Sequence, residues 1–207
     1  MRPVRITIAT IYTAVILVSA SWAQAPVLSS SPLGDDQVSV YEGFLNRFSS
    51  LKIRNLSSVT IPFDFKGFPD GRPCLNGIEL DNASESLRMT HTLDQQITKG
   101  LDITLVGSAE REKLRKAGDA LRASQKRTPS GNGQKVSSDS SYFVLSEIVF
   151  DTTRQFALLK YLIVCGQRCV SGAILVMEKR DGKWTTSSRH ACAVFLGALS
   201  AQHDTPD

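Results

Sequence analysis

Histidine is scarce in this 207-residue sequence, which contains only His91, His190 and His203. His203 lies in a polar C-terminal tail, so two histidines remain as candidate bases. The sequence also lacks the Gly-x-Ser-x-Gly nucleophile elbow, the phosphate-binding glycine loop, the EF-hand loop and the His-Glu-x-x-His helix. These absences argue against the enzyme and metal-binding classes that such motifs mark. We expect no cofactor and no metal, and we assign no catalytic residue.

Aromatic residues are also few, at 7% of the chain, and the formal net charge is only +4. In the densest basic stretch, residues 111–127, acidic residues stand between the basic ones and no aromatic side chain is present to stack on a base. This pattern is typical of a solvated helix face. We therefore expect no nucleic-acid partner.

Only one hydrophobic run is long enough to consider as a targeting or membrane segment, at residues 6–20. It is preceded by Arg2 and Arg5 and followed by small-residue cleavage sites ending at Ala23 and Ala25. A spanning helix needs roughly 20 apolar residues, so a retained anchor is the alternative rather than the prediction. The pattern predicts a signal peptide over residues 1–23, cleaved after Ala23 or Ala25. We expect a periplasmic or secreted product without a stable membrane span.

The sequence has just four cysteines, all after the predicted signal peptide: Cys74, Cys165, Cys169 and Cys192. An even number in an exported chain indicates disulfides. The short loop between Cys165 and Cys169 contains Gly166 and predicts one bond, which leaves Cys74 to pair with Cys192. The spacing differs from the Cys-x-x-Cys of redox-active pairs, and a zinc site would need more ligands than His190 could add. We predict two structural bonds.

The rest of the chain predicts one domain with a tether before it. Residues 24–36 are a flexible tether, residues 37–200 a single domain with a mobile loop near 124–141, and residues 201–207 a disordered tail. Apolar spacing predicts helices at about 36–49, 84–97 and 108–125, and strands within 51–65 and 101–106. Strand-like runs follow at 142–150, 155–164, 172–179 and 183–188, with a fifth at 191–196.

The predicted fold class is α+β, with N-terminal helices packed on a C-terminal antiparallel β-meander. Short turns separate the C-terminal runs, and Asp181-Gly182 is a strong signal for a two-residue hairpin.

Two carboxylates bracket a predicted strand end, Glu147 and Asp151. Their odd numbering would place them on one face, where paired carboxylates can act as acid and base. We favour a different interpretation, in which Asp151 caps the following turn and Glu147 faces solvent. The candidate ligand-facing side chains are Tyr161, Trp184 and His190, although a Trp after a hairpin turn is also typical of a core anchor.

Several C-terminal motifs together resemble a recurrent module of uncharacterised exported bacterial proteins. They are the stretch at 145–151, the strand through Ala157 and Tyr161, the Cys165-Gly166-x-x-Cys169 loop and Glu178-Lys179-x-x-Gly182-x-Trp184. In the relatives, two glycines follow the second cysteine. Here Val170 and Ser171 come before Gly172, so a glycine-lined pocket is not implied. The resemblance implies a secreted α+β domain and carries no agreed activity or catalytic residue.

The resulting functional expectation is an exported, non-catalytic domain that binds a ligand or protein, or has a structural role, in the envelope or outside the cell. The sequence does not identify that ligand or partner. The alternative is an envelope enzyme, either a Ser/His hydrolase using His91 or His190 or a thiol–disulfide protein using Cys165 and Cys169.

Overall fold

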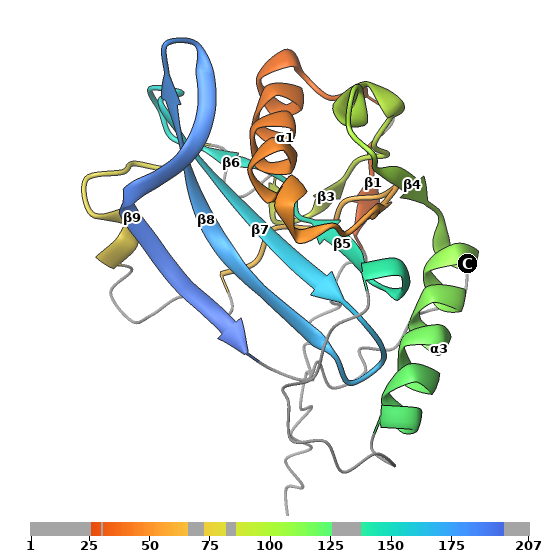
Figure 1. Ribbon diagram of the computed structural model, residues 1–207. Coiled ribbons are helices and arrows are strands. Elements are labelled where there is room, and N and C mark those ends of the chain that lie inside the picture. The colour runs from red at the N-terminus through yellow and green to blue at the C-terminus, as the bar shows by residue number, and fades with distance from the viewer. Residues whose placement is uncertain (1–25, 30, 66–72, 82–85, 126–137, 197–207) are drawn as a thin grey trace, which may run out of the picture.

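The computed structural model describes residues 26–29, 31–65, 73–81, 86–125 and 138–196, and gives the backbone alone at 125, 138 and 191–196. The predicted signal peptide and C-terminal tail lie outside these residues, as does most of the predicted loop near 124–141. Figure 1 shows a twisted sheet crossed on one face by a helix, with a second long helix beside it. No helix in the described part of the chain is long and apolar enough to cross a membrane.

The α+β class is confirmed, but the sheet is mixed rather than purely antiparallel. Its strands run in the order β4-β2-β5-β7-β8-β9, and β6 pairs with β7. Strand β2 pairs in parallel with both β4 and β5, whereas the later pairs are antiparallel. The bounds are β2 Asn55–Ser57, β4 Thr104–Val106, β5 Tyr142–Leu145, β6 Val149–Phe150, β7 Phe156–Val164, β8 Val170–Arg180 and β9 Lys183–Leu196. The predicted meander therefore forms the C-terminal part of a larger sheet.

Smaller elements complete the described chain. Strands β1 (Val27–Leu28) and β3 (Met89–Thr90) form a separate parallel pair. Four short 3₁₀ helices lie between the larger elements, and their bounds are η1 Ser49–Leu51, η2 Pro73–Leu75, η3 Gln95–Thr98 and η4 Ser138–Ser140.

The predicted helix at about 36–49 is confirmed as α1, Asp35–Phe48. Two aspartates in its first turn and Arg47 in its last turn suit the helix dipole. The Gln37 side chain accepts a hydrogen bond from the Gly34 amide at 2.9 Å and so closes the N-terminus. The apolar stripe predicted from the spacing is the buried face of the helix.

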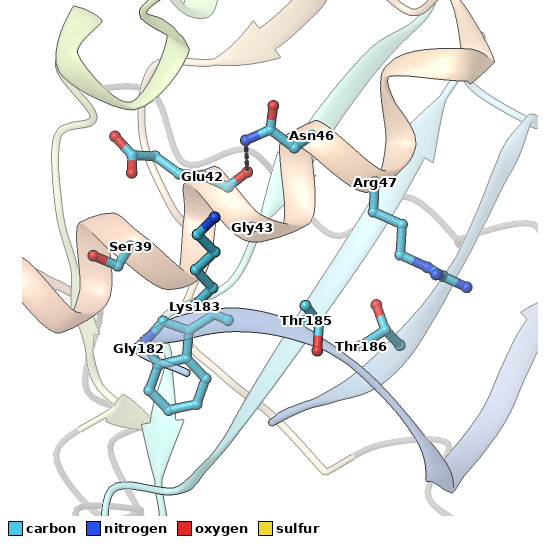
Figure 2. A pocket seen from close by; sticks show the side chains of 10 residues that line it. Ser39, Glu42, Gly43, Asn46, Arg47, Gly182, Lys183, Thr185 and Thr186 are labelled. Atoms are coloured by element: carbon cyan, nitrogen blue, oxygen red, sulfur yellow. Dashed lines mark hydrogen bonds between the residues drawn. The ribbon is translucent and has the colours of Figure 1, made fainter. Parts of the chain in front are cut away.

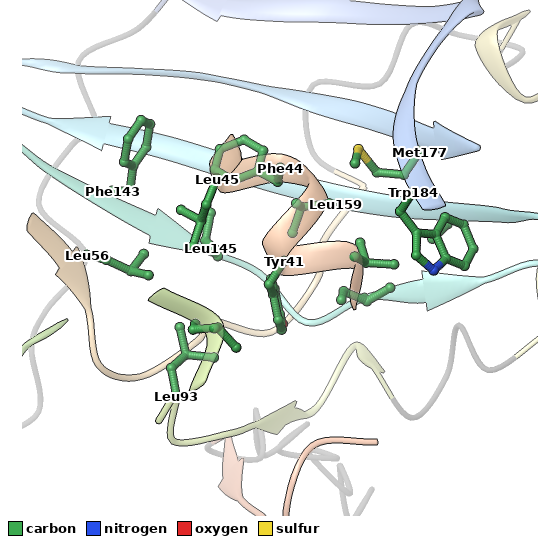
Figure 3. Packing of buried hydrophobic residues seen from close by; sticks show 14 of the residues in the cluster. Tyr41, Phe44, Leu45, Leu56, Leu93, Phe143, Leu145, Leu159, Met177 and Trp184 are labelled. Atoms are coloured by element: carbon green, nitrogen blue, oxygen red, sulfur yellow. The ribbon is translucent and has the colours of Figure 1, made fainter. Parts of the chain in front are cut away.

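That buried face of α1 covers the sheet and builds the main core. Figure 3 shows Tyr41, Phe44 and Leu45 lying over side chains from β5, β7 and β8. The sheet side of the cluster is formed by Phe143, Leu145, Leu159 and Met177. Burying a large apolar side chain contributes about 1.5–3 kcal/mol, so α1 is held mainly by this contact.

The Asp181-Gly182 hairpin is confirmed, with φ of 50° at Asp181 and 74° at Gly182. Positive φ at both central residues defines the type I′ turn, whose twist matches the strands it joins. After the turn, β9 extends over Lys183–Leu196, and its register against β8 shifts between Met177 and Leu175 and again between Leu175 and Ala173. The two strand runs predicted at 183–188 and 191–196 are thus one strand, which forms an edge of the sheet.

The helix predicted over 84–97 is wrong for most of its length: Ser86 is helical, but the short strand β3 and the 3₁₀ helix η3 follow it. This segment pairs with the chain near residue 60. The Thr60 amide donates to the His91 carbonyl at 3.0 Å, and the Leu93 amide donates to the Ser58 carbonyl at 2.8 Å. These non-local backbone bonds outweigh the local helical spacing.

The predicted helix at 108–125 is confirmed as α3, Ser108–Gln125. Its C-terminal half docks on the Cys165–Cys169 loop. A Cβ on Gly118 would lie 2.2 Å from the Cys165 carbonyl oxygen, so only glycine permits this approach. The Asp119 carboxylate accepts from the Gln167 amide at 2.9 Å, and Arg122 donates to the Arg168 carbonyl at 3.0 Å.

Candidate functional site

A β-bulge separates β5 from β6 and sets the direction of the residues between them. Leu145 faces Tyr161 and Val149 faces Leu158, so residues 146–148 oppose only residues 159 and 160. The extra residue breaks the alternation of the strand. Ser146 repairs the ladder, because its hydroxyl accepts from the Lys160 amide at 2.9 Å.

The bulge turns Glu147 inward, where only 2% of the residue is exposed. One carboxylate oxygen accepts from the Thr60 hydroxyl, and the other lies 2.9 Å from Nδ1 of His91. The Thr60 hydroxyl oxygen in turn accepts from the His91 amide at 2.7 Å. The prediction that Glu147 faces solvent is therefore wrong. We call Thr60, His91 and Glu147 the buried triad.

Asp151 lies apart from the buried triad and serves the turn after β6. Its carboxylate accepts from the Thr153 amide at 3.2 Å and from the Phe156 amide at 2.7 Å. The predicted turn cap is confirmed. Because the bulge shifts the alternation between Glu147 and Asp151, the two carboxylates do not form an acid–base pair.

Tyr41 connects α1 to the same bulge. Its hydroxyl donates to the Ser146 carbonyl at 2.9 Å. Burial, and then the nearby negative charge of Glu147, raises the pKa of Tyr41 well above its usual value. The phenol thus remains a protonated donor when the protein is folded at neutral pH.

The buried triad has part of the chemistry of a catalytic site. A carboxylate on Nδ1 orients an imidazole and leaves Nε2 to exchange a proton or bind a metal. Nε2 of His91 makes no hydrogen bond to a described residue. Over the same part of the chain, no group of three or more His, Cys, Asp or Glu side chains is arranged to hold a metal. The clearest role of the triad is to join the segments around residues 60, 91 and 147.

A polar pocket of about 420 Å³ lies between α1 and the start of β9. This volume is in the range of small-molecule sites, roughly 300–1,000 Å³. Figure 2 shows Arg47 extending from α1 toward the level of Thr186, and Lys183 extending from β9 toward α1. The lining residues are Ser39, Glu42, Gly43, Asn46, Arg47, Gly182, Lys183, Trp184, Thr185 and Thr186.

The charges in this pocket are uncompensated in an otherwise paired region. Lys179 of β8 binds Asp36 at 2.9 Å, and Arg180 binds Glu178 at 2.7 Å. By contrast, Arg47 and Lys183 form no ion pair with a described residue, and neither does the Glu42 carboxylate. The pocket therefore presents two cations and one anion to solvent.

The candidate ligand-facing residues occupy three different environments. Trp184 is 3% exposed, and its ring lies 5.8 Å from that of Phe150, so the side chain is a core anchor in a residue that also borders the pocket. The Tyr161 ring is tilted against that of Phe44, with 5.2 Å between the ring centres. The Nδ1 atom of His190 lies 3.1 Å from the Cys74 carbonyl oxygen. The structure does not bring these three side chains together in one site.

The predicted Cys165–Cys169 bond is confirmed, with a Cα–Cα distance of 5.1 Å. The two residues are 7% and 9% exposed. A redox-active sulfur must be accessible to its partner thiol, so this burial favours a structural bond. Cys74 is also disulfide-bonded, whereas the side chain of its predicted partner, Cys192, lies outside the described ones.

Sequence reasoning did not select several residues of these two sites. Thr60 sits among many other hydroxyl residues, and Glu42 and Arg47 look like the solvated face of α1. Lys183 follows a recognised hairpin turn, which was the one available signal for the pocket. A two-residue turn places the next residue at the start of an edge strand, but it does not identify the helix that covers it.

Comparison of the chain with protein-family models, with curated proteins and with solved structures finds no match in any of the three. The resemblance to a module of exported bacterial proteins therefore stays a prediction.

Proposed function

We propose that this protein is exported to the periplasm or the medium and works there without catalysis, by binding a small polar ligand that carries negative charge. The observation that carries the proposal is the pocket between α1 and β9, where Arg47 and Lys183 face solvent without a carboxylate partner among the described residues. Closed disulfides fit an oxidising compartment, where thiols tend to end as disulfides.

The composition of the pocket supports a ligand of this class. Threonine and serine hydroxyls line it together with the two cations, and the Trp184 ring points into the core instead of offering a stacking surface. Carboxylates and phosphates are the groups that arginine recognises best, because its planar fork donates two parallel hydrogen bonds. Glu42 adds an acceptor for a ligand N–H group.

Binding is tested by isothermal titration of the mature protein with a panel of carboxylates and phosphates at low and high salt. For any compound of the panel that binds the wild-type protein, we expect Arg47→Gln and Lys183→Gln each to weaken binding about tenfold, which corresponds to about 1.4 kcal/mol. Affinity should also fall with ionic strength, because both cations are exposed.

Matched controls come from exposed cations outside the pocket. Arg88→Gln and Lys99→Gln remove the same charges and should leave affinity unchanged. If all four variants weaken binding equally, the affinity depends on the net charge of the protein and not on contacts in the pocket. Fractionation of the source cells checks the other half of the proposal, since a cytoplasmic full-length product contradicts export.

The contact between Glu147 and His91 favours a second candidate, an envelope hydrolase with His91 as the base. In this alternative Nε2 of His91 removes a proton from an attacking hydroxyl or water. The protein would then cleave members of a nitrophenyl ester and phosphate panel, and His91→Asn would abolish cleavage while the circular dichroism spectrum stays native. If the panel compounds are hydrolysed no faster with the protein than in buffer alone, a hydrolase acting on these compounds is ruled out.

A further inference from the structure

The edge of β9 determines what kind of ligand can enter the pocket. In the type I′ hairpin Arg180 and Lys183 are directly paired, and antiparallel pairs alternate between hydrogen-bonded and non-bonded. Lys179 and Trp184 are therefore a non-bonded pair, and so are Met177 and Thr186 two residues further along. The Lys179 amide confirms that its pair with Trp184 is non-bonded, because it donates away from β9, to the Gln155 carbonyl at 2.9 Å.

It follows that the backbone groups of Trp184 and Thr186 point away from β8, toward the open side of the sheet. The Trp184 carbonyl meets α1, since a Cβ on Gly43 would lie 2.4 Å from its oxygen. The Thr186 amide and carbonyl come next along the edge and lie in the pocket wall. The alternation of the ladder gives them no partner in β8, and no backbone bond outside the ladder joins them to another described residue.

An exposed strand edge with a free amide and carbonyl is the surface that an extended peptide recognises, by adding itself as one more strand. Here the edge faces a helix across a pocket, and the two unpaired cations Arg47 and Lys183 stand on its two sides. A peptide can satisfy both features, because it provides backbone groups for the edge and a carboxylate for the cations.

We propose that the ligand of this pocket is an extended peptide segment that pairs with the Thr186 edge and places a carboxylate against Arg47 and Lys183. This inference rests on the proposed function. The carboxylate is either the C-terminus of the peptide or an Asp or Glu side chain. The Glu42 carboxylate accepts from a peptide N–H group, which accounts for the one anion in the pocket.

The test uses ¹⁵N-labelled mature protein and four short peptide probes based on acetyl-Val-Thr-Val-Glu. The probes are the parent peptide, its C-terminal amide, its Glu→Gln version, and a version N-methylated at the central residues, which cannot donate to a strand edge. Glutarate serves as a carboxylate that has no peptide backbone. Chemical shifts of the Thr186 amide and titrated affinities are the two readouts.

We expect the parent peptide to shift the Thr186 amide and N-methylation to weaken binding at least tenfold. The C-terminal amide lacks the terminal carboxylate and the Glu→Gln probe lacks the side-chain carboxylate. The probe that fails to bind identifies the carboxylate that the pocket recognises. Thr186→Pro removes the outward amide without removing a ladder bond to β8 and should also weaken the peptide. Should that variant fail to fold, the N-methylated probe makes the same test on native protein.

The outcomes separate this inference from the proposed function. If glutarate binds as tightly as the peptides, with dependence on Arg47 and no effect of N-methylation, the pocket binds anions and the peptide inference is overturned. If no probe and no member of the anion panel binds, or binding ignores Arg47→Gln and Lys183→Gln, both are overturned.

Discussion

Replacing Glu147 with alanine removes the acceptor for two buried donors at once. The Thr60 hydroxyl keeps only its longer contact, 3.3 Å to the His91 carbonyl oxygen, and Nδ1 of His91 loses its acceptor within a side chain that is only 9% exposed. A buried donor left without its acceptor costs about 1–3 kcal/mol, and more where the lost partner was charged. That is a large fraction of the stability of a typical domain, about 5–15 kcal/mol. We therefore expect Glu147→Ala to unfold at markedly lower urea concentration.

The isosteric Glu147→Gln variant separates charge from shape. Glutamine keeps one acceptor oxygen, so it can accept from the Thr60 hydroxyl or from Nδ1 of His91 and loses the other bond. Loss of one hydrogen bond to a charged group costs about 1.5–3 kcal/mol, so this variant should fall between wild type and Glu147→Ala. A cycle with His91→Ala should give a coupling energy of about 1 kcal/mol or more, as residues in one network do.

Equilibrium urea unfolding followed by far-UV circular dichroism measures these differences. Glu110→Ala is the matched control, because Glu110 pairs with Lys113 on the surface of α3 and its side chain is 49% exposed. Exposed pairs contribute about 0–1 kcal/mol. A Glu147→Ala variant within 1 kcal/mol of wild type, like the control, would refute the idea that the buried triad joins the three segments.

Three further predictions concern α3, the disulfide loop and the response to alkali. Gly118→Ala forces a methyl group against the Cys165 carbonyl oxygen, so we expect the free energy of unfolding to fall by about 1–3 kcal/mol and hydrogen exchange in α3 to become faster. As a control, Ala120→Gly on the exposed side of α3 should leave hydrogen exchange in the disulfide loop unchanged. Replacing Cys165 and Cys169 together with serine should lower the free energy of unfolding by about 2 kcal/mol, the value for a five-residue loop, and unchanged stability would show that the bond does not restrict the unfolded chain. The raised pKa of Tyr41 means that the unfolded chain loses this proton first, so stability is complete below about pH 10 and falls above it by at most about 1.4 kcal/mol per pH unit. Tyr41→Phe should reduce that slope in urea titrations between pH 9 and 11, and an unchanged slope would contradict the assignment.

The features that local sequence determines were predicted well. The stripe of α1, the charged helix α3 and the turn at Asp181-Gly182 each depend on residues a few positions apart, and each is found as expected. The Cys165–Cys169 bond is equally local, since a single short loop brings the sulfurs together.

The features that depend on distant pairing were not predicted. The strands predicted within 51–65 and 101–106 exist as β2 and β4, but the parallel pairing of β2 with β4 and β5 was not predicted. Parallel neighbours come from distant parts of the chain, and no short-range pattern identifies them. The same holds for the segment with His91, whose backbone bonds to residues near Thr60 replaced the helix that its spacing favoured.

Glu147 shows why strand alternation, in which odd and even residues face opposite sides of the sheet, did not predict the position of this side chain. The rule assumes an uninterrupted ladder, in which each residue has one partner and odd and even positions keep to opposite faces. A bulge adds one residue, so every position beyond it changes face relative to those before it. The bulge itself is stabilised by the Ser146 hydroxyl and by the Tyr41 phenol from α1, which lies 105 residues away in sequence. A charged residue in a strand is ordinarily exposed, and only those two contacts, together with Thr60 and His91, make the inward position of Glu147 favourable.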